Sequence, residues 1–139
     1  MAEGESRAEV VLQRLVIDRA REQCHLELRE RAGARRLRLP IGVVEAAAYD
    51  WVLREGAEAA QPLPRVPHAL LLQLLAALAA RLLAAELEPE RAGWWPARLL
   101  IEAADGSRRQ LLCRAVDAIL VAHLDGAPIL AAPGLFAER

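Results

Sequence analysis

The sequence predicts an α+β domain in which helices pack on a mixed, largely antiparallel sheet. Segments of alternating apolar and polar residues indicate strands, and apolar segments of helical period follow them. The order strand, strand, helix occurs once in each half of the chain, which favours α+β over other classes. A length of 139 residues suits one domain. We therefore expect a polar N-terminal tail at residues 1–8 and a single domain at residues 9–139.

Strands are predicted for most of the first half. Val10–Ile17 is an apolar stretch, and residues 25–29 and 37–41 alternate between apolar and polar side chains around a turn at Ala32-Gly33. The alternation places one set of apolar side chains on the same face of the sheet: Leu26, Leu28, Leu37, Leu39 and Ile41.

The second half repeats this pattern. Residues 98–104 and 108–113 are predicted strands, and Asp105-Gly106 between them is a strong hairpin turn signal. A short extended segment led by Pro128 is expected near the end of the chain.

One helix is predicted after each hairpin. The first runs from about Val43 to Arg54 and the second from about Ala115 to Leu124. Gly56 and Gly126 follow them, and glycine is the usual residue just past a helix C-terminus.

The two halves resemble one another in sequence. Arg35–Leu39 aligns with Arg108–Leu112, and after a one-residue gap Val44–Ala46 aligns with Val116–Ala118. The alignment predicts a duplicated hairpin-helix unit with an acidic residue, Glu45 or Asp117, in the first turn of each helix.

The segment between the halves contains a predicted linker at residues 57–67 and a predicted helix at residues 69–87. Five leucines of this helix share a broad stripe: Leu71, Leu74, Leu75, Leu78 and Leu82. Further leucines lie outside the stripe, so the helix is too apolar for a one-sided surface helix. We expect a homodimer or larger assembly to bury part of this helix or of Trp94-Trp95, which are expected to open the next strand beside Pro96.

Net charge, cysteine spacing and the lengths of apolar segments limit which kinds of partner and site the chain is expected to have. The net charge of -1 does not predict a strongly basic surface for nucleic acid, although all 18 basic residues are arginine. Cys24 and Cys113 have no zinc-ligand spacing and are expected to be reduced. There is neither an apolar signal segment nor a stretch long enough to span a membrane, so a cytoplasmic protein without membrane contact is expected.

Candidate chemistry is confined to a few polar residues. Carboxylates such as Glu45 and Asp117 stabilise the first turn of a helix, and this role would account for both. Alternatively, with nearby arginines, they bind a metal ion or orient a water. His68 lies at the start of the leucine-rich helix, where it either makes a local hydrogen bond or acts as a general base.

The order of these segments resembles the bifunctional nuclease domain family. The likeness covers about Val10 to Phe136 and depends on three stretches in this order: LRLPIGVVEAAAYDWVL, RVPHALLLQLLAAL and GWWPARLLIEAADGSRRQLLCRAVDAILVAHLDGAPIL. The resemblance implies an α+β domain that associates with itself, and a nuclease activity on DNA and RNA.

The resemblance also implies a set of site residues: Glu45, Arg65, His68, Arg114 and Asp117. The chain departs from the family pattern beside them. Ala115 and Val116 replace a proline and a serine, and Ala69 replaces an aspartate after His68. Each of these changes removes a polar group or a proline.

Two functions follow as hypotheses. The first is a nuclease that hydrolyses DNA or RNA phosphodiesters with the five residues. Its site would be degenerate and its activity weak or absent. The sequence requires no cofactor, and the use of a divalent metal ion is left open. The second is a non-catalytic homo-oligomeric interaction or regulatory module. Clustering of the site residues in a pocket would favour the nuclease, and separation of His68 from Asp117 would favour the module.

Overall fold

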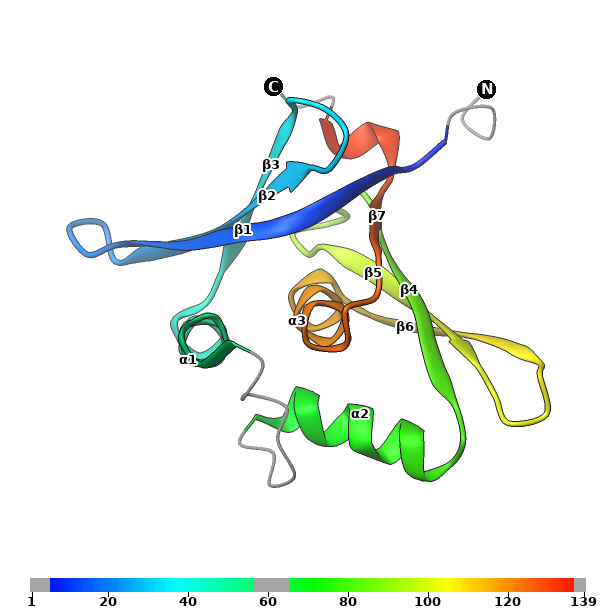
Figure 1. Cartoon of the computed structure of the whole chain (residues 1–139). Coiled ribbons are helices and arrows are strands. Elements are labelled where there is room, and N and C mark those ends of the chain that lie inside the picture. Colours follow the sequence, from blue (N-terminus) through cyan, green and yellow to red (C-terminus); the bar gives the residue numbers. More distant parts are fainter. Residues whose placement is uncertain (1–5, 57–65, 137–139) are drawn as a thin grey trace.

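Seven strands and three α-helices make up most of the described chain (Figure 1). The computed structural model describes residues 6–56 and 66–136. In chain order the elements are β1 (Ala8–Asp18), β2 (Gln23–Glu30), β3 (Arg36–Ile41), α1 (Val43–Glu55), α2 (Pro67–Ala77), β4 (Arg81–Leu87), β5 (Pro96–Glu102), β6 (Arg108–Arg114), α3 (Ala115–Asp125), β7 (Ile129–Ala131) and the 3-10 helix η3 (Pro133–Phe136). Strands β4 and β7 pair in parallel and the other described pairs are antiparallel, which confirms the predicted α+β class and mixed sheet.

The short strand β7 is the central strand of the sheet. The strand order is β3-β2-β1-β7-β4-β5-β6, so β7 lies between two three-stranded meanders. The first meander is followed by α1 and the second by α3. These units correspond to the two predicted halves, and Glu45 and Asp117 are each the third residue of their helix. A common origin of the two halves stays a prediction.

The strand residues of the two units correspond in the structure with an offset that differs by one residue from the sequence alignment. Leu39 pairs with Leu26, and the residue in the equivalent position of the second unit is Leu111, which pairs with Leu99. Leu112, the residue aligned with Leu39 in the sequence, points to the other face of the sheet and is 67% exposed. Leu111 is itself 47% exposed. Counted back from Glu45 and Asp117, the third residues of α1 and α3, Leu39 corresponds to Leu111 without a gap, and a shift of one residue would move a strand's side chains to the opposite face.

Helix α3 occupies the centre of the molecule. Figure 1 shows it end-on between the arm formed by β1, β2 and β3 and the arm formed by β4, β5 and β6. Residues 118–122 are at most 1% exposed, so the helix is buried around its circumference. It ends before Gly126, whose φ of 80° closes the helix as predicted.

The predicted helix at residues 69–87 is wrong in its second half. α2 ends at Ala77, and Arg81–Leu87 is β4, which lies between β7 and β5. Leucine and alanine favour helices, but pairing along both edges of a central strand outweighs that preference. Leu82 and Leu87, which were expected on the helix, are therefore buried residues of the sheet.

An unusual helix end explains why the sequence pattern did not show this boundary. The N–H of Ala80 donates to the carbonyl of Leu75, and the N–H of Ala79 donates to the carbonyl of Ala76. This pair of bonds is a Schellman motif, whose left-handed residue is usually glycine. Here Ala79 takes that position with a φ of 59°.

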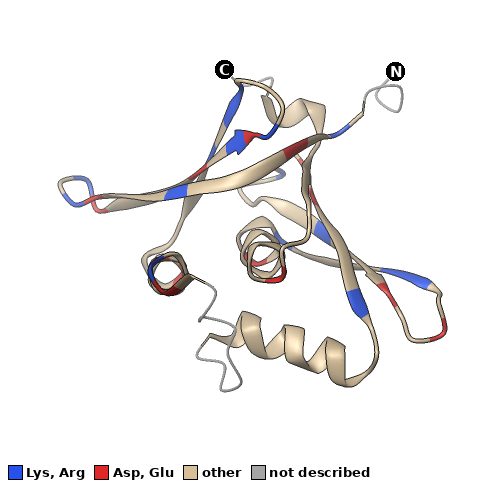
Figure 2. Ribbon diagram, in the orientation of Figure 1, with Lys and Arg blue, Asp and Glu red and all other residues tan. Residues whose placement is uncertain are grey.

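One side of α2 faces outward and is apolar. Leu70, Leu74 and Leu78 are 58%, 53% and 63% exposed, and we call these three residues the α2 leucine stripe. Figure 2 shows that the helix carries no Lys, Arg, Asp or Glu. Helix α2 has 11 residues, and no described helix is long and apolar enough to cross a membrane.

Several predicted boundaries of strands, tail and linker differ from the observed ones by a few residues. β5 begins at Pro96, so the two tryptophans precede the strand, and Trp94 forms an isolated bridge with Arg91. Arg7, placed in the predicted tail, donates hydrogen bonds to the Leu87 carbonyl and the Glu88 carboxylate. The predicted linker is almost wholly outside the described residues, and its last residue begins α2.

Candidate functional site

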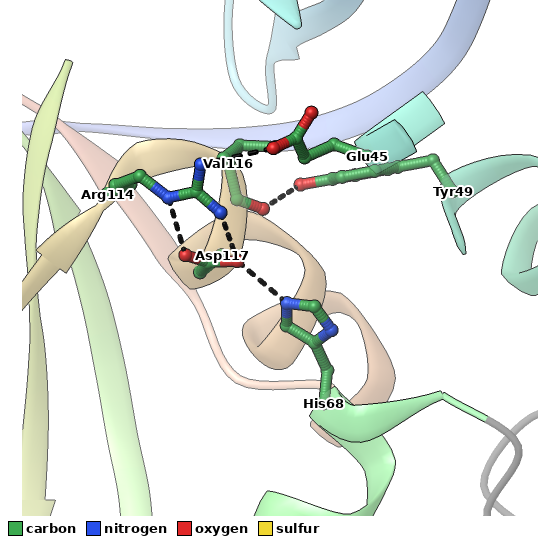
Figure 3. Close-up of polar contacts among 6 residues, drawn as sticks. All are labelled: Glu45, Tyr49, His68, Arg114, Val116 and Asp117. Carbon is green, nitrogen blue, oxygen red and sulfur yellow. Dashed lines mark hydrogen bonds and ion pairs between the residues drawn. The ribbon is translucent and has the colours of Figure 1, made fainter. Parts of the chain in front are cut away.

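Four of the five predicted site residues lie together where the first turns of the three helices meet. Glu45 comes from α1, His68 is the second residue of α2, Asp117 comes from α3, and Arg114 ends β6 directly before α3. Figure 3 shows their side chains in one connected network. We call these four residues the Asp117 cluster. The fifth, Arg65, lies outside the described residues.

Arg114 joins the two carboxylates. Its Nε donates to Asp117 Oδ2 at 2.9 Å and its Nη2 donates to Oδ1 at 3.3 Å, so the pair is bidentate. Its Nη1 donates to Glu45 Oε2 at 3.1 Å. A planar guanidinium has the donor geometry for both contacts, whereas the single ammonium group of a lysine does not. Asp117 is thus paired with Arg114 in the structure.

His68 contacts Asp117 from the opposite side. Its Nε2 lies 2.9 Å from Asp117 Oδ1, across a separation of 49 residues in the sequence. The other ring nitrogen, Nδ1, is buried and has no hydrogen-bond partner among the described residues. A general base needs a ring nitrogen that reaches its substrate. In this geometry His68 therefore holds Asp117 in place and its free nitrogen does not face solvent.

The contacts determine the ionisation of the cluster. Partial burial opposes ionisation of Asp117, but hydrogen bonds from Arg114 and His68 outweigh it and lower the pKa of Asp117 below its ordinary value. A backbone hydrogen bond in the first turn, and then Arg114, lower the pKa of Glu45. The two carboxylates in turn raise the pKa of Arg114. The cluster at neutral pH therefore contains two carboxylates bridged by one guanidinium.

Asp117 does not have the helix-capping role that its position suggested. The N-terminus of α3 has no side-chain cap, and the carboxylate of Asp117 is engaged by Arg114 and His68. The positive end of the helix dipole still favours the charge of a carboxylate in the first turn. Its main partners are nevertheless side chains from other positions, as expected for a site and not for a simple cap.

Two residues that support the cluster were missed by sequence reasoning. Tyr49 is 1% exposed, and its hydroxyl donates a hydrogen bond to the carbonyl of Val116 (Figure 3). Gly42 precedes α1, and a Cβ at this position would lie 2.5 Å from Glu45 Oε1. The Tyr49 contact depends on the packing of α1 beside α3, whereas the space beside Gly42 is set by the first turn of α1 itself. The available signals were weak: Tyr49 is the chain's one tyrosine and follows Glu45 by one helical turn.

A hollow of about 380 Å³ opens beside the cluster. His68 and Asp117 line it together with apolar residues, among them Leu71, Leu99 and Leu111. Cys113 also lines this hollow, and burial raises the pKa of its thiol to about 11. A thiol with such a pKa is protonated at neutral pH and is a poor nucleophile. The polar chemistry of the hollow is therefore supplied by His68 and Asp117.

The described residues include no group of three or more His, Cys, Asp or Glu side chains that would hold a metal ion. In the cluster, the guanidinium of Arg114 lies between the carboxylates of Asp117 and Glu45. A bridging cation of this kind stabilises two nearby carboxylates, as a metal ion would.

A family model described as bifunctional nuclease domain matches residues 26–139. The matched range includes all three helices and all four residues of the Asp117 cluster. A comparison with curated proteins gave no match.

Proposed function

The chain belongs to the bifunctional nuclease domain family, and on this premise we propose that it hydrolyses phosphodiester bonds of nucleic acid, slowly, at the Asp117 cluster. The observation that carries the proposal is the contact of His68 with Asp117 at 2.9 Å, beside an arginine and at the edge of a hollow. Residues 49 positions apart in the sequence converge there, which a purely local helix-capping role of Asp117 would not require.

Arg114 is suited to bind the phosphate. Three of its five N–H bonds are used by described residues, and the guanidinium side chain is 55% exposed. Two N–H bonds therefore remain, and one of them can donate to a phosphate oxygen, a group that arginine binds well. Positive charge at this point stabilises the negative charge that develops on the phosphoryl oxygens during attack.

Asp117 is suited to orient the attacking water. Its side chain is 33% exposed, and its carboxylate keeps lone pairs beyond those used by Arg114 and His68. In the proposed step the water oxygen attacks phosphorus and the bond to the leaving sugar oxygen breaks. The water proton passes to Asp117, and the leaving oxygen takes a proton from solvent. A carboxylate whose pKa is lowered is a weak proton acceptor, so slow turnover is expected.

His68 is a positioning residue in this proposal, since its Nε2 bonds Asp117 and its Nδ1 is buried. Replacing it frees the Asp117 carboxylate on one side. Because the His68 hydrogen bond lowers the pKa of Asp117, its removal raises that pKa. The acid limb of the pH–rate profile should then move to higher pH, an effect that a merely structural role would not produce.

The substitutions that distinguish this chain from the family pattern also favour slow turnover. The N–H of Ala115 donates to the carbonyl of Trp95 at 2.7 Å, a bond that a proline could not make. Ala69 is buried beside His68, where the family pattern has an aspartate. Val116 replaces a serine and brings no hydroxyl group. The chain has kept the charged cluster while losing polar groups around it.

The test measures cleavage of single-stranded DNA and RNA by the purified protein, with Mg²⁺, with Mn²⁺ and with a chelator. Asp117→Asn should remove cleavage, and His68→Ala should lower it by about 10²-fold while moving the acid limb of the pH profile upward. His123→Ala and Asp50→Asn, at exposed or solvent-accessible positions away from the cluster, are the matched controls and should cleave as the unmodified protein does.

Cleavage that persists unchanged in Asp117→Asn would show that a contaminant or another site is responsible. Absence of cleavage under all metal conditions would leave the second candidate, a non-catalytic homo-oligomeric module. The observation that favours this second candidate is the exposed α2 leucine stripe.

A further inference from the structure

A cavity separate from the hollow beside His68 lies at the other carboxylate of the cluster. It has a volume of about 170 Å³, and its walls include Leu39, Ile41, Trp94, Trp95, Glu45 and Arg114; we call it the tryptophan pocket. It does not share His68 or Asp117 with the hollow described above. Pockets for drug-sized ligands start at about 300 Å³, so this one suits a single small group and not a whole nucleotide.

The aromatic side of the pocket is held in place by backbone contacts on both flanks. The carbonyl of Trp95 accepts the Ala115 N–H at 2.7 Å, and Trp94 exchanges two backbone hydrogen bonds with Arg91. Trp94 is nevertheless 40% exposed, which is costly for a large apolar ring unless something covers it. A partly exposed indole at a cavity wall, on a backbone held by hydrogen bonds, is suited to stack against another flat ring.

The polar side of the pocket has one donor group and one acceptor group. Arg114 has two N–H bonds that the described residues do not use, so one can donate to a base while the other donates to the phosphate. The Glu45 carboxylate accepts from Arg114 and from a backbone N–H of its helix and keeps further lone pairs. A guanidinium donates to ring nitrogens and carbonyl oxygens, whereas a carboxylate accepts from exocyclic amino groups. Flat apolar walls with a donor and an acceptor at one edge match the faces and the edge of a nucleobase.

The position of the pocket relates it to the proposed reaction. Arg114 lines the pocket and also makes the bidentate pair with Asp117. A base in the pocket and the phosphate in its proposed position would therefore both contact the guanidinium of Arg114. A base that stacks on an indole must first leave its own stack, so the pocket selects unpaired nucleotides.

We propose that the tryptophan pocket binds one unstacked nucleobase of the substrate, and that the substrate is consequently single-stranded nucleic acid. This inference rests on the proposed nuclease function. Glu45 only accepts hydrogen bonds. Bases with an exocyclic amino group (adenine, cytosine and guanine) have at least two N–H bonds at that edge, so they should bind better than uracil, whose one donor is N3–H.

The test separates base binding from cleavage. Calorimetric titration of the full chain with adenosine, cytidine, guanosine and uridine measures the pocket without any phosphate, and ribose 5-phosphate measures phosphate binding without a base. We expect saturable binding of at least one amino-bearing nucleoside in the millimolar range and weaker binding of uridine. Trp94→Ala should weaken nucleoside binding by about tenfold, as expected for loss of one stacking contact. Trp94→Phe should largely retain it.

Two further measurements complete the design. Leu112→Ala, at an exposed leucine outside the pocket, is the matched control and should bind nucleosides normally. Glu45→Gln keeps the size of the side chain but adds a donor, so it should reduce the preference for amino-bearing bases over uridine. Circular dichroism of each variant confirms its fold. In the cleavage assay, a single-stranded oligonucleotide should be cut at least about tenfold faster than the same sequence in a duplex.

The outcomes are distinguishable. Nucleoside binding without cleavage would contradict the nuclease proposal and keep the base pocket. Cleavage without nucleoside binding, or equal binding of all four nucleosides by the unmodified protein and Trp94→Ala, would overturn the base pocket alone. A change of molecular mass in Trp94→Ala with unaltered nucleoside binding would overturn it too, and would make the pocket part of an interface between copies of the chain.

Discussion

Tyr49 is the residue that ties the first helix to the first turn of the third. Its ring is buried in the core, and its hydroxyl donates to the carbonyl of Val116, next to Asp117. Burial raises the pKa of Tyr49 well above its ordinary value, so the hydroxyl stays a donor over the working pH range. The contact holds α1, which carries Glu45, against α3, which carries Asp117.

We expect Tyr49→Phe to lower the free energy of unfolding by about 1 kcal/mol, because it removes one buried hydrogen bond and leaves the ring packing intact. Urea denaturation followed by circular dichroism measures the change. Tyr49→Leu is the comparison, since it also removes packing and should cost more. If Tyr49→Phe is as stable as the unmodified protein, the hydroxyl makes no net contribution and the link between the helices depends on packing alone.

The end of α2 and the start of β4 depend on the conformation of one alanine. Ala79 has a φ of 59°, a left-handed conformation that costs a residue with a Cβ roughly 1–2 kcal/mol relative to glycine. The bonds from Ala79 and Ala80 back to α2 nevertheless close the helix there. The adjacent strand pairs on both sides, and this pairing over-determines the turn.

Ala79→Gly should therefore stabilise the protein, by about 0.5–1 kcal/mol after the greater flexibility of glycine in the unfolded chain is subtracted. Thermal unfolding by calorimetry would show a higher Tm. Ala76→Gly, inside α2, is the matched control and should lower the Tm, because glycine is unfavourable in a helix interior. A lower Tm for Ala79→Gly would contradict the left-handed assignment at this position.

Three exposed leucines lie on α2 and at its C-terminus. The α2 leucine stripe and the uncharged surface of the helix in Figure 2 leave leucine side chains in water at one side of the fold. Contiguous apolar patches of this kind are typical of interaction surfaces. We propose that a second copy of the chain covers the stripe, as helix-to-helix contact in a homodimer would do.

Light scattering at micromolar protein concentration should give a dimer mass or larger for the unmodified chain. Leu74→Glu, in the middle of the stripe, should give a monomer, because it would bury an unpaired carboxylate in the interface. Leu112→Glu, at an equally exposed leucine on β6, should keep the assembly. A monomer mass for the unmodified chain would refute the homodimer. Dissociation by Leu112→Glu but not by Leu74→Glu would show that the interface lies on β6 and not on α2.

Local patterns along the chain determined the fold class, the two hairpin-helix units and the glycine ends of α1 and α3. They also singled out Glu45, His68 and Asp117, with several open roles, and the resemblance to the family added Arg114. Alternation, helical period and turn residues act over a few positions, and such short-range preferences are readable without the fold. This is why the strands of the first meander, the hairpin of β5 and β6, and the helices α1 and α3 were predictable.

Contacts between segments far apart in the chain decided the boundary between α2 and β4 and the assembly of the site. The sequence has the composition of one long helix at residues 69–87, and only the pairing of β4 between β7 and β5 divides it. The Tyr49 contact, the tryptophan pocket and the approach of His68 to Asp117 join segments far apart in the chain. Burial and hydrogen bonding at these positions depend on how α1, α2 and α3 pack together, and no local sequence pattern carries that information.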